Sequence, residues 1–161
     1  MSFEVYDMEP PLISILSPQN KNYSTNIIWA NVTLSEAGSW CGRNLDSSTN
    51  VSMTNSSGNW NDKMRNLTDG SHNIRFYCND TVGNIGISNT IYFFSCLADV
   101  TGPNNTKDNK IDMRDIGYIS NKFMTTPSSP NWDINADLND DGVVNMRDIG
   151  IATSRFGKTC Q

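Results

Sequence analysis

The chain lacks several features that mark common classes of protein. No run of about 18 apolar residues occurs in its sequence, which excludes a helix that spans a membrane. Its 12 Lys and Arg residues are outnumbered by 17 Asp and Glu residues, so it lacks the basic stripe with which nucleic-acid-binding proteins neutralise phosphates. Its 4 Cys residues include no C-x-x-C pair, which argues against a zinc or thioredoxin-like redox site.

Signatures of catalysis are also missing. The single histidine, His72, follows a turn at the start of an expected strand, where a lone histidine is expected to be structural or exposed. The sequence contains no G-x-S-x-G motif, no Ser/His/Asp arrangement and no paired carboxylates outside its acidic C-terminal region. We therefore expect that this chain is not itself an enzyme.

Export from the cytosol is indicated by the cysteines and by N-glycosylation motifs. Disulfides, which we expect here, persist outside the cytosol. Residues 1–11 lack the basic start and apolar stretch of a secretion signal, so we expect a mature chain or a fragment of something longer. The expected location is secreted or at the cell surface. Asn-x-Ser/Thr acceptors occur at Asn22, Asn31, Asn50, Asn55, Asn66, Asn79 and Asn104.

Apolar residues alternate with polar ones from residue 11 to residue 95, which predicts an all-β sandwich of about seven short strands. Turn residues such as those of Asn55-Ser-Ser-Gly58 separate the expected strands. No apolar period of helix length appears in this half. The residues expected to face inward are Ile28, Ala30, Val32, Leu34, Ile74, Phe76, Cys78, Ile85, Ile87, Ile91 and Phe93.

Two cysteines of this half have the parity of inward-facing residues. Cys41 and Cys78 are therefore expected to meet across neighbouring strands as a disulfide, and the alternative is two buried free thiols. Such a bridge would stabilise the fold by roughly 4 kcal/mol in the chain-entropy model. Core or cross-strand packing, rather than stacking on sugars, is the expected role of Trp29, Trp40 and Trp60.

Three stretches of this half carry a family resemblance. They are Asn55-Ser-Ser-Gly-Asn-Trp-Asn61, Leu67-Thr-Asp-Gly-Ser-His72 and Tyr77-Cys-Asn-Asp-Thr-Val-Gly-Asn84. Together they resemble the immunoglobulin-like repeats of archaeal and bacterial surface proteins. The resemblance implies a spacer or adhesive unit.

A short sequence occurs twice in the C-terminal region and indicates two domains. Ile111-Asp-Met-Arg-Asp-Ile-Gly117 recurs as Val144-Asn-Met-Arg-Asp-Ile-Gly150, an offset of 33 residues (144 minus 111). We therefore expect an N-terminal strand or linker over residues 1–10, the β-sandwich over 11–95 and a small helical module over 96–161.

The second copy belongs to a twelve-residue loop of the kind that binds calcium. Oxygen-bearing side chains occupy positions 1, 3, 5, 9 and 12, and Gly142 at position 6 permits the sharp turn. The carbonyl of Val143 supplies position 7. A solvated acidic turn is the alternative. The expected side-chain ligands are Asp137, Asn139, Asp141, Asn145 and Asp148.

The first copy, aligned from its shared end, carries an insertion. Nine residues lead from position 1 to position 5 in place of four, which predicts a surface bulge at 102–105. Asn109 stands where glycine is expected, and Asn tolerates the left-handed conformation. The alternative is a degenerate loop held by hydrogen bonds alone. The expected ligands are Asp99, Thr101, Asp108, the carbonyl of Lys110, Asp112 and Asp115.

A short amphipathic helix is expected after each loop, over 113–123 and 146–156. So small a module is not expected to stay folded on packing alone, so bound calcium must contribute to its stability. Since Cys41 and Cys78 are paired with each other, Cys96 and Cys160 remain to staple the two ends of the module. The apolar stripes expected to pack together are Ile116, Ile119 and Phe123, and Ile149, Ala152 and Phe156.

Two Asp/Asn-rich loops, each followed by a helix in near-identical repeats, make residues 97–159 resemble a dockerin domain. The resemblance implies that both loops bind Ca²⁺ and that a helix face docks onto a cohesin domain through loop positions 10 and 11 and the helix end. The identical Met-Arg pairs at positions 10 and 11 imply a pseudo-symmetric module that can bind in either orientation. The implied docking residues are Met113, Arg114, Lys122, Met146, Arg147 and Arg155.

The leading interpretation is thus a non-catalytic, calcium-dependent attachment module with the sandwich as spacer. A second interpretation is a structural subunit of an extracellular assembly, which associates with itself through the strand-like segment Ser2–Tyr6 or either domain. A third is the anchoring fragment of a larger secreted hydrolase, since dockerins often accompany enzymes.

Overall fold

The computed structural model describes residues 7–102 and 106–160 of the 161-residue chain. The leading segment Ser2–Tyr6 and the acceptor Asn104 lie outside the described residues. The chain divides into two compact units. The first comprises residues up to Lys21, Ile28–Met64 and His72–Phe93, and the second comprises Asn22–Ile27, Arg65–Ser71 and the chain from Phe94 onward.

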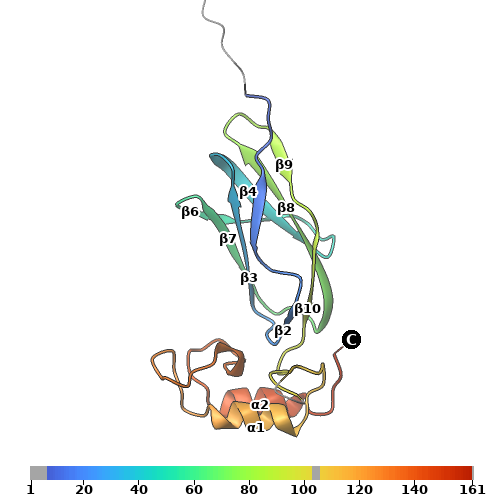
Figure 1. Cartoon of the computed structure of the whole chain (residues 1–161), viewed down its shortest axis with the longest axis vertical. Helices are drawn as coiled ribbons and strands as arrows, with labels where there is room; N and C mark the ends of the chain where they lie inside the picture. Colours follow the sequence, from blue (N-terminus) through green and yellow to red (C-terminus); the bar gives the residue numbers. More distant parts are fainter. Residues whose placement is uncertain (1–6, 103–105, 161) are drawn as a thin grey trace, which may run out of the picture. The chain divides into compact units, whose positions relative to one another are not determined.

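The β half is a sandwich of two sheets, as predicted (Figure 1). One sheet has the strand order β1-β3-β7-β6, and the other has the order β2-β10-β8-β4-β5 with β9 paired to β8. The described residues contain ten strands rather than about seven, because several consist of two or three residues. The strands are β1 (Ile13–Ser17), β2 (Asn22–Tyr23), β3 (Ile28–Leu34), β4 (Gly38–Leu45), β5 (Val51–Ser52), β6 (Thr54–Ser56), β7 (Asn59–Met64), β8 (Gly70–Asp80), β9 (Ile85–Ile87) and β10 (Ile91–Ser95).

Alternation along the strands fills the core of the sandwich. Ile74 and Phe76 on β8 are fully buried, as are Ala30 and Val32 on β3. Cys41 on β4 lies directly opposite Cys78 on β8, and the two form the predicted disulfide. The inward parity read from the sequence therefore holds for β3, β4 and β8.

The prediction was wrong for β9. Ile85 and Ile87 are each 58% exposed, and Gly86 between them is the buried residue. A Cβ atom on Gly86 would lie 2.1 Å from the carbonyl oxygen of Pro11, so only glycine allows the two backbones to approach this closely. That close approach turns the isoleucines outward.

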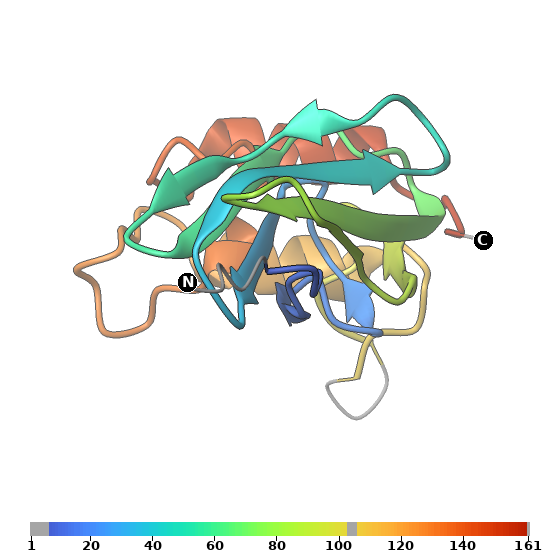
Figure 2. The same ribbon diagram turned by 90° about the horizontal axis from the view of Figure 1, so that it is seen from above.

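Two helices follow the sandwich: α1 (Met113–Asn121) and α2 (Met146–Ser154). They lie side by side and contact each other (Figure 1 and Figure 2). A short 3₁₀ helix, η2 (Ile134–Ala136), precedes the second loop. No helix in the described part of the chain has the length and apolar character needed to cross a bilayer.

Both helices end two residues earlier than expected. Their last turns are closed by Lys122 and Arg155, and the chain then reverses through residues with positive φ. The reversal carries Phe123 and Phe156 out of the apolar stripes, and these side chains are 42% and 55% exposed. Their assignment to the helix-packing stripes was therefore wrong.

The second unit has a small core of its own. Ile119 on α1 and Ala152 on α2 are fully buried in it, and Ile116 and Ile149 pack against it. The predicted disulfide joins the module's two ends, and both of its cysteines belong to this core. The other buried members are Leu97, Ala98, Ile111, Ala136, Leu138 and Val144.

Candidate calcium-binding loops

Asp115 at the end of the first loop ties that loop together. One of its carboxylate oxygens accepts hydrogen bonds from the backbone N–H groups of Val100 and Thr101, each at 2.9 Å. The other accepts from the N–H of Asp112, also at 2.9 Å, and so closes a capping box at the start of α1. Residues on both sides of the insertion are thereby fixed around one buried carboxylate.

Asp148 holds the second loop in the same way. Its Oδ1 accepts from the N–H groups of Leu138 at 2.8 Å and Asn139 at 3.3 Å. Its Oδ2 accepts from the N–H of Asn145 at 2.8 Å, which caps α2. Asn145 lies 33 residues after Asp112, whereas Leu138 and Asn139 lie 38 residues after Val100 and Thr101. The difference of five residues is the length of the insertion in the first loop, so equivalent residues of the two loops make equivalent hydrogen bonds.

The turn of the second loop is built on carboxylate and amide oxygens. Asp137 accepts hydrogen bonds from the backbone of Asp141 at 3.2 Å and of Gly142 at 2.8 Å. The Nδ2 of Asn139 donates to Asp141 Oδ2 at 3.0 Å. These contacts link positions 1, 3 and 5 of the loop, which are three of the expected calcium ligands.

The first loop repeats this turn with asparagine in place of glycine. Asn109 has φ 60°, close to the φ 84° of Gly142, so the expected left-handed conformation is present. Its N–H donates to Asp99 at 3.1 Å, as that of Gly142 donates to Asp137. At the insertion, a Cβ on Gly102 would lie 2.3 Å from the carbonyl oxygen of Thr106, so the backbone at Gly102 lies close to the backbone at Thr106.

Each loop is braced by the segment that follows the opposite helix. Ile111, at position 8 of the first loop, exchanges backbone hydrogen bonds with Gly157 and Lys158, beyond α2. Val144, at position 8 of the second loop, does the same with residues 124 and 125, beyond α1. Neither loop is therefore complete without the other repeat.

The electrostatics of the first loop favour a cation. Asp99 is 1% exposed, and burial raises the pKa of its carboxyl to about 6, with the nearby charge of Asp115 adding to the effect. Among the described residues, its Oδ1 is buried without a hydrogen-bond partner. Burial also raises the pKa of Asp137 at the equivalent position. An orphaned carboxylate oxygen among oxygen donors fits a hard divalent cation such as calcium.

The sequence of the C-terminal region matches a known family model. The family model of the dockerin type I domain matches residues 105–155. The C-terminal region is dockerin-like. The match begins after Asp99 and Thr101, so the start of the first loop lies upstream of it. A search of curated proteins finds no match.

Among solved structures, the chain resembles fibronectin(III)-like modules of Clostridium thermocellum CbhA, with a TM-score of 0.45 and 11% identity over 53% of this chain and 98% of that one. It also resembles a type II cohesin-X-dockerin complex from Acetivibrio cellulolyticus, with a TM-score of 0.36 and 19% identity over 74% and 82%. A Cellulomonas fimi endo-beta-1,4-mannanase matches with a TM-score of 0.41 and 9% identity, over 54% of this chain and 19% of that one.

The expected docking residues of the dockerin-like region differ in their surroundings. Met113 and Met146 are each 66% exposed at the first turns of α1 and α2. Arg114 and Arg147 reach back to the loop carboxylates Asp112 and Asp141, at 3.0 and 3.9 Å. At the helix ends, the Lys122 Nζ lies 5.3 Å from the centre of the Tyr118 ring, and Arg155 is ion-paired with Asp69.

Residues of the Arg65–Ser71 and Asn22–Ile27 segments support the second unit, and the sequence did not reveal them. Asp69 accepts a hydrogen bond from the N–H of Leu97 at 3.0 Å and also binds Arg155. The hydroxyl of Ser24 donates to the carbonyl of Asp99. Asp69 stands in a Thr-Asp-Gly turn motif, whose local pattern explains the turn and carries no sign of a distant partner.

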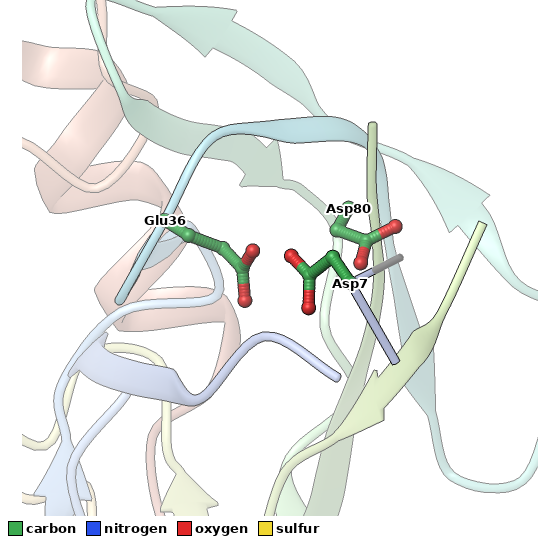
Figure 3. A group of neighbouring side chains, drawn as sticks. All are labelled: Asp7, Glu36 and Asp80. Carbon is green, nitrogen blue, oxygen red and sulfur yellow. The ribbon is translucent and has the colours of Figure 1, made fainter. Parts of the chain in front are cut away.

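A second acidic cluster lies in the first unit (Figure 3). Carboxylate oxygens of Asp7, Glu36 and Asp80 lie within 4.8 Å of one another, and within the described residues no other three His, Cys, Asp or Glu side chains lie as close together. The Asp80 carboxylate accepts hydrogen bonds from Gly83 at 2.6 Å and from Asn84 at 2.9 and 2.6 Å. These bonds outweigh desolvation and lower the pKa of Asp80, so its evident role is to hold this turn.

The remaining candidates of the sandwich have structural surroundings. His72 is 5% exposed, its Nδ1 lies 2.7 Å from Asp46 Oδ2, and its ring stacks on Phe93. Trp60 is buried in the core, as expected, whereas Trp29 is 46% exposed. Glycosylation stays a prediction: Asn22, Asn50, Asn55 and Asn66 are exposed, and Asn31 and Asn79 are half-buried.

Proposed function

We propose that this chain is a non-catalytic attachment module whose C-terminal region binds two calcium ions and docks onto a cohesin-like domain of a partner protein. The carrying observation is the duplicated carboxylate scaffold of Asp115 and Asp148, which places both loops in one register despite the insertion. The dockerin type I match over residues 105–155 supports the assignment of this scaffold to docking.

Calcium supplies the positive charge that these loops need. In the first loop it would be held by Asp99, Thr101, Asp108, the Lys110 carbonyl, Asp112 and Asp115, and in the second by Asp137, Asn139, Asp141, the Val143 carbonyl, Asn145 and Asp148. If the free calcium concentration is about a thousand times the dissociation constant, each bound ion would add roughly 4 kcal/mol to the free energy of unfolding of the module.

The proposed docking face is formed by the first turns of the two helices. Met113 and Met146 expose large, adaptable apolar side chains beside the basic Arg114 and Arg147, a combination enriched in protein interfaces. Calcium would order the loops that precede these turns, which makes docking depend on calcium. Arg155 is bound to Asp69, so we assign it a lesser part in docking than Lys122.

The sandwich would act as a spacer for this module. Two disulfides support a secreted or cell-surface location, since such bonds persist in oxidising compartments.

Titration calorimetry of the full chain with Ca²⁺, followed by binding to a panel of purified cohesin domains with calcium or with EGTA, tests the proposal. We expect two calcium ions per chain and calcium-dependent capture by at least one cohesin. Met113→Asp with Met146→Asp should abolish capture but keep calcium binding. Met8→Asp, at a methionine 82% exposed elsewhere, should change neither. Absence of calcium binding would overturn the whole proposal. Calcium binding without capture by any cohesin would overturn the assignment of a cohesin-like partner.

A further inference from the structure

The four-stranded sheet carries a groove whose lining contains no charged side chain. Its volume is about 520 Å³, and all of its residues belong to the first unit. The groove crosses β1, β3, β7 and β6, away from the calcium loops in the sequence. It is lined by Leu16, Trp29, Asn31, Ser56, Asn59 and Asn61.

Strand register places these side chains next to one another. On β3, Ile28, Ala30 and Val32 point into the core, so Trp29 and Asn31 point to the outer face. Asn31 lies opposite Asn61 on β7, and Ser56 on β6 lies opposite Asn59. The amide and hydroxyl groups therefore form a continuous row across three strands.

The row offers both donors and acceptors of hydrogen bonds. Each asparagine amide presents an oxygen acceptor and two N–H donors, and the serine hydroxyl can serve as either. Within the part of the chain that the structure describes, the side chains of Asn31, Ser56 and Asn59 hydrogen-bond to no other protein group. Such a set matches neutral hydroxyl groups on a ligand, and the lining itself carries no charged side chain, with the Lys63 ammonium as the charge that lies beside Trp29.

Trp29 supplies an apolar surface beside this row. Its side chain remains 46% exposed, although Lys63 on the adjacent strand places its Nζ 5.6 Å from the ring centre and restrains the indole. Leu16, 53% exposed, extends the apolar surface from β1. A flat apolar ring next to amides suits a ligand with one apolar face and a rim of hydroxyls.

We propose that this groove binds a neutral oligosaccharide, with one pyranose ring stacked on Trp29 and its hydroxyls hydrogen-bonded to Asn31, Asn59 and Asn61. The chemistry of the lining carries this assignment: an uncharged ligand rich in hydroxyls satisfies both the amide row and the indole. The sandwich then binds a glycan surface while the C-terminal region attaches elsewhere. This inference does not depend on calcium or on docking.

The other occupant to consider is the chain's own glycan, since Asn31-Val-Thr33 is an N-glycosylation motif. A glycan linked to Asn31 would fill the groove from within. The test therefore begins with full chain made in a host without N-glycosylation.

Binding of cellohexaose, xylohexaose, mannohexaose and, as a charged comparison, hexagalacturonate would be measured by calorimetry and tryptophan fluorescence. We expect at least one neutral hexasaccharide to bind and hexagalacturonate not to bind. Trp29→Ala should lower the affinity by at least about tenfold. Tyr92→Ala, at an aromatic residue 65% exposed on the other sheet, is the matched control and should leave it unchanged. Unaltered circular dichroism and melting temperature establish that both variants fold.

Failure of all three neutral hexasaccharides to bind would overturn the proposal, and so would equal losses in Trp29→Ala and Tyr92→Ala. If the sugars fail but chain made in a glycosylating host carries a glycan on Asn31 whose enzymatic removal changes the fluorescence of Trp29, the groove holds the chain's own glycan. That result also overturns binding of an external ligand.

Discussion

Asp115 and Asp148 each accept two backbone hydrogen bonds from the start of their loop and a third from the residue that caps the following helix. Each carboxylate therefore links three functions: it orders the loop, starts the helix and remains able to coordinate a cation through its other lone pairs. The equivalence of the two residues also explains how the first loop tolerates an insertion. Residues before and after the insertion are held by one buried side chain, so Val100 and Thr101 keep the contacts that Leu138 and Asn139 make in the second loop.

Replacement of Asp148 should disable the second loop. Asp148→Ala leaves the N–H groups of Leu138, Asn139 and Asn145 without their acceptor and removes a calcium ligand, so we expect a loss of roughly 2 to 4 kcal/mol in the free energy of unfolding. Calorimetry should find one calcium ion per chain in place of two. The control is Asp140→Asn, since residue 140 has φ 59°, which asparagine tolerates, and it lies outside the predicted ligand set. Two bound ions in Asp148→Ala would contradict the assignment.

The left-handed residue of the first loop gives a test that concerns the backbone. Asn109→Gly should keep stability within about 0.5 kcal/mol, whereas Asn109→Val should lower it by roughly 1 to 2 kcal/mol, because a β-branched residue is strained at φ 60°. Chemical unfolding in saturating calcium measures both changes. Lys107→Val, in the same loop at a residue without positive φ, controls for the introduction of valine. Equal effects of valine at the two positions would show that the conformation of Asn109 is not the cause.

Much of this architecture could be predicted because its determinants are local or periodic. The second loop follows from oxygen donors at fixed spacing around Gly142, and the Cys41–Cys78 pairing follows from strand parity. Asp69 shows which contacts could not be predicted from the sequence. Its sequence context specifies a turn, but its bonds to Leu97 and Arg155 depend on tertiary folding, which brings together segments far apart in the sequence.

The errors have a similar origin. Phe123 and Ile85 fit helical and strand periodicity, respectively. The helix ended before Phe123, however, and a close approach of backbones at Gly86 reversed the parity of the strand that contains Ile85. Periodicity identifies which residues share a face, but it does not reveal where an element stops or which backbone passes nearby.

The second disulfide should matter more to the first calcium loop than to the second. The N–H of Cys160 donates to the carbonyl of Asn109 at 2.9 Å, and Lys158 accepts from the N–H of Ile111, so the C-terminal segment braces the first loop directly. Cys96→Ala with Cys160→Ala frees that segment. We expect the free energy of unfolding to fall by roughly 2 to 5 kcal/mol and the first loop to lose more calcium affinity than the second.

Calcium titration of this double variant beside Cys41→Ala with Cys78→Ala separates the two contributions. The Cys41 and Cys78 pair lies within the sandwich, so its removal should lower the stability of the chain and leave both calcium affinities intact. Equal weakening of both loops by the Cys96 and Cys160 changes would count against a specific brace on the first.

The buried carboxyl of Asp99 predicts how stability depends on pH when calcium is absent. Its pKa of about 6 in the folded chain exceeds the 3.8 of an unperturbed aspartate, so between pH 3.8 and about 6 the folded state binds more protons than the unfolded state. The stabilising contribution of the protonated group is thus present at pH 4 and is lost as pH rises through about 6. Burial raises the pKa of Asp137 as well, and its effect on stability has the same sign.

Bound calcium neutralises the carboxylate when the proton is lost, so the increase in melting temperature caused by calcium should be larger at pH 7 than at pH 5. Melting curves in EGTA and in calcium across this range provide the measurement. Because other carboxylates titrate in the same range, the informative quantity is the difference between the wild-type chain and Asp99→Asn, whose side chain stays neutral. That variant should lose less stability between pH 4 and pH 7 in EGTA, and an unchanged pH profile would mean that Asp99 does not carry the effect.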